Sequence, residues 1–127
     1  MDRTLMTPDY LDFDYSEDAD GNGSFDAMAS VAPQQLPAVH AEIAAVLAWA
    51  HDAFAGRRGA TDDGCEWDFD LQSHQEFSVP ETMRFEEATG MLTVQPGEPG
   101  AARHVVSLSI GGSPAFCDAL RTQFEIA

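Results

Sequence analysis

The chain has 127 residues, of which 44% are hydrophobic, and its 22 acidic residues outnumber its six basic residues to give a net charge of −16. This length and composition are typical of one globular domain with a hydrophobic core and argue against a disordered chain. The negative charge repels nucleic acid and anionic lipid and attracts cations and basic proteins, so we expect neither a nucleic-acid partner nor a membrane partner.

Three sequence features predict a protein of the bacterial cytoplasm. No apolar run is long enough to span a bilayer, and Asp2 and Asp9 lie where a signal peptide would need a basic end and an apolar core. Cys65 and Cys117 have no metal-binding or redox spacing, so we expect reduced thiols. All six basic residues are arginine, a composition typical of high-GC bacterial genomes.

The first structure expected along the chain is a β-hairpin. Residues 10–17 and 24–31 alternate apolar and polar side chains, a period of two that is typical of half-buried strands. The polar, glycine-rich segment between them fits a tight turn, in which the Asn22-Gly23 pair would supply the positive φ angles.

Two helices are predicted. Residues 33–55 carry apolar side chains at steps of three and four, which form one stripe along a helix, and Gly56 is a suitable stop. Residues 113–125 form the second helix, with Ser113 as the N-cap.

Four strands are predicted between these helices. The four strands cover residues 66–72 (continuing irregularly to Phe77), 83–87, 91–95 and 103–110. The Gly111-Gly112 pair is expected to end the last strand.

The order ββαββββα with hairpin-sized connections predicts an α+β fold, a two-layer sandwich. One layer is a mostly antiparallel sheet of about six strands, and both helices cover one face of it. The domain is expected to span residues 10–127 and to follow a flexible tail, residues 1–9. The sheet face against the helices should hold the large apolar side chains, namely Phe13, Tyr15, Phe25, Trp67, Phe69, Phe85, Leu92 and Val94.

The opposite sheet face is predicted to be an acidic binding surface. Residues 11–15 and 67–71 share a pattern in which large apolar residues alternate with aspartates, and Arg84 is the only base in phase with them. Like charges across neighbouring strands destabilise a sheet. Bound cations or a basic partner would offset this destabilisation. The alternative interpretation is a solvated face that keeps the chain soluble. The predicted binding residues are Asp12, Asp14, Asp26, Asp68, Asp70 and Glu86.

The tip of the first hairpin is a candidate metal site. Asp18, Asp20, Asn22 and Asp26 occupy ligand positions of a calcium-binding loop, and the twelve residues that begin at Asp18 resemble the EF-hand family. The closing position, where that family has a bidentate Glu, is Ala29, so the resemblance implies only weak, millimolar calcium binding. Turn composition is the alternative explanation for the same residues.

No catalytic motif stands out. The sequence has no nucleotide-binding loop, serine-nucleophile elbow or zinc-protease helix, and its carboxylates are too numerous to single out an acid–base pair. The first prediction is therefore a non-catalytic interaction module that binds a basic protein partner, acting as an inhibitor, an antitoxin-like protein, a chaperone or a mimic of nucleic-acid charge. A divalent-cation-binding protein and an enzyme with an unrecognised carboxylate site are the alternatives. Apart from weak calcium binding no cofactor is expected, and the sequence leaves the oligomeric state open.

Overall fold

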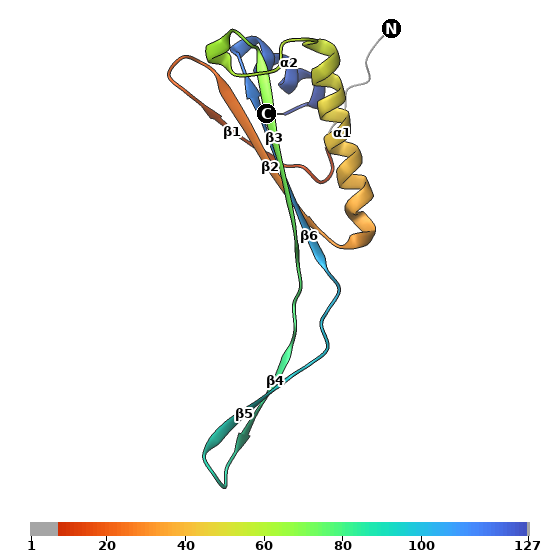
Figure 1. The fold of residues 1–127 in the computed structure, drawn as a ribbon, viewed down its shortest axis with the longest axis vertical. Helices are drawn as coiled ribbons and strands as arrows, with labels where there is room; N and C mark the ends of the chain where they lie inside the picture. The colour runs from red at the N-terminus through yellow and green to blue at the C-terminus, as the bar shows by residue number, and fades with distance from the viewer. Residues whose placement is uncertain (1–7, 127) are drawn as a thin grey trace.

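The computed structural model describes residues 8–126, and its elements follow the predicted order (Figure 1). The strands are β1 (Phe13–Glu17), β2 (Gly23–Val31), β3 (Trp67–Glu76), β4 (Glu81–Glu86), β5 (Met91–Pro96) and β6 (Arg103–Gly112). The helices are α1 (Leu36–Ala53) and α2 (Pro114–Phe124), and short 3-10 helices cover Pro33–Gln35 and Thr61–Asp63. The predicted α+β class with antiparallel strand pairing is confirmed. None of the helices in the described part of the chain is long and apolar enough to cross a membrane.

The six strands are divided between two sheets. Four strands form the body sheet in the order β1-β2-β6-β3, and β4 and β5 form a separate two-stranded ribbon. This ribbon is the end of an arm (residues 77–102) that extends away from the body and beyond both helices (Figure 1). Backbone hydrogen bonds from Gly100 N to Ser78 O and from Gly97 N to Pro80 O hold the two sides of the arm together between the sheets.

The length of the strands explains why the helices do not cover the ribbon. At about 3.3 Å per residue, the roughly 20 residues from Trp67 to Glu86 span about 66 Å. The 18 residues of α1 span only about 27 Å. The prediction that Phe85, Leu92 and Val94 face the helices is therefore wrong, because all three are exposed in the arm.

The hydrophobic core lies between the body sheet and the two helices. Phe13, Tyr15 and Phe69 pack against it and stay partly exposed. Because the core side chains of the sheet all meet the helices, the two helices cover the same sheet face, and we call the other face the open face. The fully buried side chains come from both layers: Phe25, Trp67, Leu108 and Ile110 from the sheet, and Val39, Val46, Phe116, Cys117, Leu120 and Phe124 from the helices.

The glycine pair of β6 does not end the strand as predicted. Gly111 and Gly112 are its last two residues and pair with both neighbouring strands. A Cβ atom on Gly112 would overlap the carbonyl oxygen of Glu66, and one on Gly111 would overlap that of Gly23. Glycine is therefore required here because the backbones of the neighbouring strands approach too closely for a side chain.

The two cysteines are free thiols, as predicted. Cys117 is buried in α2, and its Sγ–H donates a weak hydrogen bond to the carbonyl oxygen of Gly112 at 3.6 Å. Burial raises the pKa of the Cys117 thiol above its ordinary value. This thiol is therefore protonated and unreactive near neutral pH.

One buried carboxylate ties the segment before β1 to α1. Glu42 is 7% exposed and accepts hydrogen bonds of 3.0–3.1 Å from the backbone amides of Asp9, Tyr10 and Leu11. A buried carboxylate needs such donors to offset the loss of water. Of the predicted tail, residues 1–7 lie outside the described residues, and Asp9 is held by this contact.

Replacing Glu42 by Gln should lower the free energy of unfolding by about 2 kcal/mol, because an amide NH₂ would then face backbone N–H donors. Urea denaturation would measure the loss. Ala48→Gln, at an exposed position of the same helix, is the control and should change stability by less than about 0.5 kcal/mol. Equal stabilities for the two variants would contradict this role for Glu42.

Candidate binding site

The strand register places three of the predicted aspartates in one row across the open face. Asp14 of β1 lies directly opposite Asp26 of β2. Ser109 of β6 is next in the row, and Asp70 of β3 completes it. Side chains that are directly opposed have Cβ atoms about 5 Å apart, so Asp14 and Asp26 form a pair of like charges in close contact.

Small side chains on β6 turn this row into the middle of a trough. Ser107, Ser109 and Gly111 form its floor, beneath two adjoining hollows of about 480 and 390 Å³. Because β2 and β3 both neighbour β6, Asp26 and Asp70 stand two strand spacings apart, about 10 Å, and Asp14 on β1 lies one spacing farther from Asp70. We call this feature the acidic trough, and its walls are Asp12, Asp14 and Asp26 on one side and Asp68 and Asp70 on the other.

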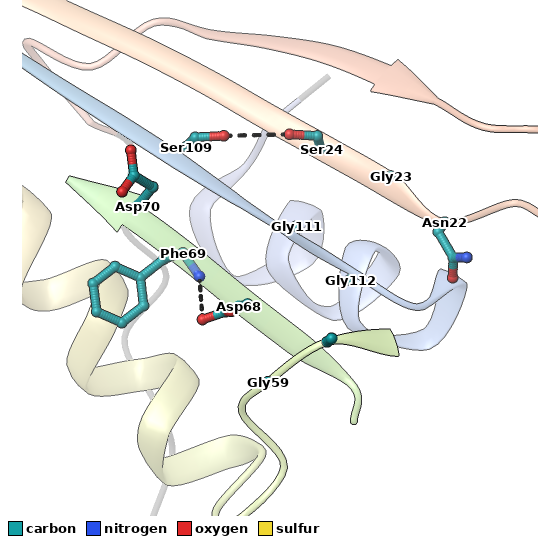
Figure 2. A pocket seen from close by; sticks show the side chains of 11 residues that line it. Asn22, Gly23, Ser24, Gly59, Asp68, Phe69, Asp70, Ser109, Gly111 and Gly112 are labelled. Atoms are coloured by element: carbon teal, nitrogen blue, oxygen red, sulfur yellow. Dashed lines mark hydrogen bonds between the residues drawn. The ribbon is translucent and has the colours of Figure 1, made fainter. Parts of the chain in front are cut away.

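Figure 2 shows the β3 wall of the trough from close by. Asp68 and Asp70 lie along β3, across from Ser109 and Gly111 of β6, and the Phe69 ring between them points towards α1. This is the arrangement that the alternating pattern predicted, with the aromatic ring on the helix side and the carboxylates on the open face.

Asp68 is the only wall residue that has a base beside it among the described residues. Its Oδ1 accepts hydrogen bonds from Phe69 N and Arg58 Nε, both at 2.9 Å. These bonds, first the one from the backbone, lower the pKa of Asp68 below its ordinary value. Arg58 also lies over the Phe69 ring, 4.5 Å from its centroid. The base of this face is therefore Arg58 from the loop after α1, whereas the predicted base, Arg84, lies in the arm.

The negative charges of the other wall residues are offset by few or no hydrogen bonds and ion pairs within the described residues. Asp70 Oδ2 accepts one hydrogen bond, from Gln72 Nε2 at 3.1 Å. Asp14 and Asp26 make no side-chain hydrogen bond or ion pair with any residue in the described part of the chain. Glu86, the sixth residue predicted for this face, lies at the end of β4 in the arm and does not join the trough.

The structure separates the four residues that were predicted to bind calcium. Asp26 lies in the trough, while Asp18, Asp20 and Asn22 stay at the hairpin tip. Asp18 Oδ1 accepts hydrogen bonds from the backbone amides of Asp20 and Asn22, at 2.9 and 3.0 Å. The positive φ angle of the turn is at Gly21 (85°), one residue before the predicted pair. Residues 8–126 contain no group of three or more His, Cys, Asp or Glu side chains placed to hold a metal ion.

Sequence reasoning missed the floor of the trough and the base beside it. Ser107 and Ser109 alternate with buried residues of β6, so the period of two could have placed them on the open face. Arg58 carries no such signal, because a loop residue has no phase relative to a strand.

Comparisons with known proteins give no family assignment: no protein-family model matches the chain, and no curated protein or solved structure is significantly similar to it. The function is therefore argued from the trough itself.

Replacing Arg58 by Gln should raise the pKa of Asp68 towards its ordinary value, although the Phe69 amide will keep it partly lowered. A lowered pKa in the folded state stabilises the fold above the unfolded pKa, and this contribution is lost as pH falls through the folded pKa. In Arg58→Gln this contribution should therefore be smaller, and its loss should be complete at a higher pH. NMR titration of the Asp68 carboxyl carbon measures the change, and Arg57→Gln, which removes an ion pair with Glu66, should leave this pKa unaltered.

Calcium should bind the hairpin tip no more tightly than about 10⁻⁴ M, because Ala29 replaces the closing ligand and the turn occupies Asp18 Oδ1. Calorimetric titration of the wild-type chain tests this. Micromolar binding that Asp20→Ala abolishes would show that the tip is a true calcium loop.

Proposed function

We propose that the chain is a non-catalytic interaction module that binds a basic protein partner in the acidic trough. The observation that carries the proposal is that aspartates line both sides of the 480 Å³ hollow, Asp12, Asp14 and Asp26 on one side and Asp70 on the other, above the serines of β6. A floor of small residues leaves room for a cationic side chain between the walls. Such a side chain could then interact with carboxylates from both walls.

The energetics of the row support a cationic ligand. Two carboxylates directly opposed across strands cost about 0.2–1 kcal/mol relative to a neutral pair, and within residues 8–126 no base pairs with Asp14 or Asp26 to reduce this cost. A bound guanidinium or ammonium group removes the repulsion and gains charge-assisted hydrogen bonds. A face that served only solubility could place its acidic residues apart from one another.

The spacing of the walls indicates the form of the partner. Along each wall the aspartates are two residues apart, Asp12 and Asp14 on one side and Asp68 and Asp70 on the other. Side chains on one face of an extended chain recur every 6.6–6.8 Å, roughly. An extended segment with basic residues at alternate positions would therefore match either wall. We place this interaction in the bacterial cytoplasm, which the composition of the chain favours.

The double substitution Asp26→Asn and Asp70→Asn should weaken partner capture without weakening the fold. Two exposed ion pairs at about 0.2–1 kcal/mol each correspond to a loss of about two- to thirtyfold in affinity. Thermal stability should hold or rise slightly, because like-charge repulsion is relieved. The measurement is quantitative mass spectrometry of proteins captured from lysate of the source bacterium, at low and high salt.

The matched control is Glu86→Gln with Glu87→Gln, which removes the same charge from exposed positions in the arm. It should capture the partner as well as the wild type does. Equal capture by the trough variant and the wild type at low salt would contradict the proposal and leave the acidic face as a device for solubility. Equal losses of partner capture in the trough variant and the control would show that capture depends on net charge and not on the trough.

A further inference from the structure

The ribbon at the end of the arm has one polar and one apolar face. Strands β4 and β5 pair so that Arg84 lies opposite Thr93 on the polar face. The pairs on either side of this one point the other way and are apolar, Met83 with Val94 and Phe85 with Leu92. These four side chains are called the arm's apolar face: Met83, Phe85, Leu92 and Val94.

The arm's apolar face is uncovered in the single chain, since each of its four side chains is more than half exposed. A two-stranded ribbon by itself is marginally stable in water and needs a further layer over its apolar face. Apolar and polar residues alternate from Thr82 to Glu86 and from Leu92 to Gln95, and this alternation specifies which face of the ribbon is to be buried. The ribbon is therefore built for a cover that lies outside its own chain.

We propose that the cover is the arm of a second copy of this chain. Two ribbons would stack through their apolar faces at the usual sheet-to-sheet distance of about 10 Å, with both polar faces in water. The contact uses the same surface on each copy, as a twofold-symmetric dimer requires. This inference is independent of the acidic trough, because it uses a different part of the molecule.

The distribution of charge favours a second copy over a basic partner at this surface. By alternation this face of the ribbon also includes the Glu81–Pro96 pair at its end, so it offers a basic partner only a single carboxylate. The arm carries four acids and one arginine, a net charge of −3 out of −16. Arms stacked in opposite directions place the acidic bodies at opposite ends of a ribbon about 20 Å long, farther apart than the screening length of about 8 Å.

The exposed apolar area is sufficient for a dimer. Six large apolar residues of the arm, without Met91 on the polar face, expose on the order of 600 Å² in each copy, against the roughly 800 Å² that one partner contributes to a standard interface. This area is near the lower limit of specific interfaces, so we expect a dissociation constant in the micromolar range. The six residues are exposed by 46–63%: Phe77, Val79, Met83, Phe85, Leu92 and Val94.

Sedimentation equilibrium of the full chain across a range of concentrations tests the proposal. The wild type should dimerise, and Phe85→Glu should weaken the dimer at least tenfold, because it places a charge in the centre of the stacked faces. Thr93→Glu adds the same charge to the polar face of the same ribbon and should leave the dimer intact. Near-ultraviolet circular dichroism of the buried Trp67 checks that the body of each variant is folded.

A third variant distinguishes arm-to-arm contact from an arm docked on the body of the other copy. A hollow of about 370 Å³ beside α1, lined by Ile43, Ala44, Leu47 and Leu71, is the apolar surface that such an arm would enter. Ala44→Glu should therefore leave the dimer unchanged. A chain that stays monomeric, a dimer that tolerates Phe85→Glu, equal effects of Phe85→Glu and Thr93→Glu, or dissociation by Ala44→Glu would each overturn the proposal.

Discussion

The burial of Trp67 at the start of β3 is the constraint on which the rest of the structure depends. Its ring stacks on Phe116 of α2, with centroids 5.6 Å apart and an angle of 7°, and its Nε1–H donates to the carbonyl oxygen of Phe54 at 3.3 Å. One side chain therefore joins the sheet to α2 and to the end of α1. Because successive side chains of a strand point to opposite faces, burying Trp67 fixes Asp68 and Asp70 outward.

The same end of β3 is also held by polar contacts, whereas within residues 8–126 its other end pairs with β6 alone and has no helix beside it. The Glu66 carboxylate accepts a hydrogen bond from Ser113 Oγ at 2.5 Å, and it forms an ion pair with Arg57 at 3.2 Å. The Ser113 amide donates to the carbonyl oxygen of Glu66 at 2.8 Å, where Gly112 allows the backbones to approach. The β3–β6 pair is thus fixed beside the helices. From there it runs out past them and continues into the arm, where the helices no longer supply a hydrophobic layer.

The sequence predicted the properties that depend on local alternation and missed those that depend on where elements end in space. Phe69 and Phe85 have the same alternating surroundings, yet only Phe69 lies in front of α1, because cover depends on helix length relative to strand length. The five aspartates of the trough were predicted from their positions in the apolar–polar alternation alone. Glu86 has the same phase but lies in the arm, beyond the reach of that argument. The base at Arg58 required a contact between loop and strand that no periodicity encodes.

The two surfaces differ in chemistry and in position, and their separation has a consequence for binding. A trough that depends on exposed charge pairs, each worth about 0.2–1 kcal/mol, would bind the proposed basic segment weakly. A dimer stacked through the arms would carry two troughs on one rigid frame, so a partner with two basic segments would gain from the high effective concentration of the second trough. Apolar contacts would hold such a dimer together in salt, because salt does not weaken them. Salt would weaken only the charge pairs in the two troughs, by screening. If both proposals hold, the acidic body and the apolar arm would be complementary parts of a weak but bivalent binding device.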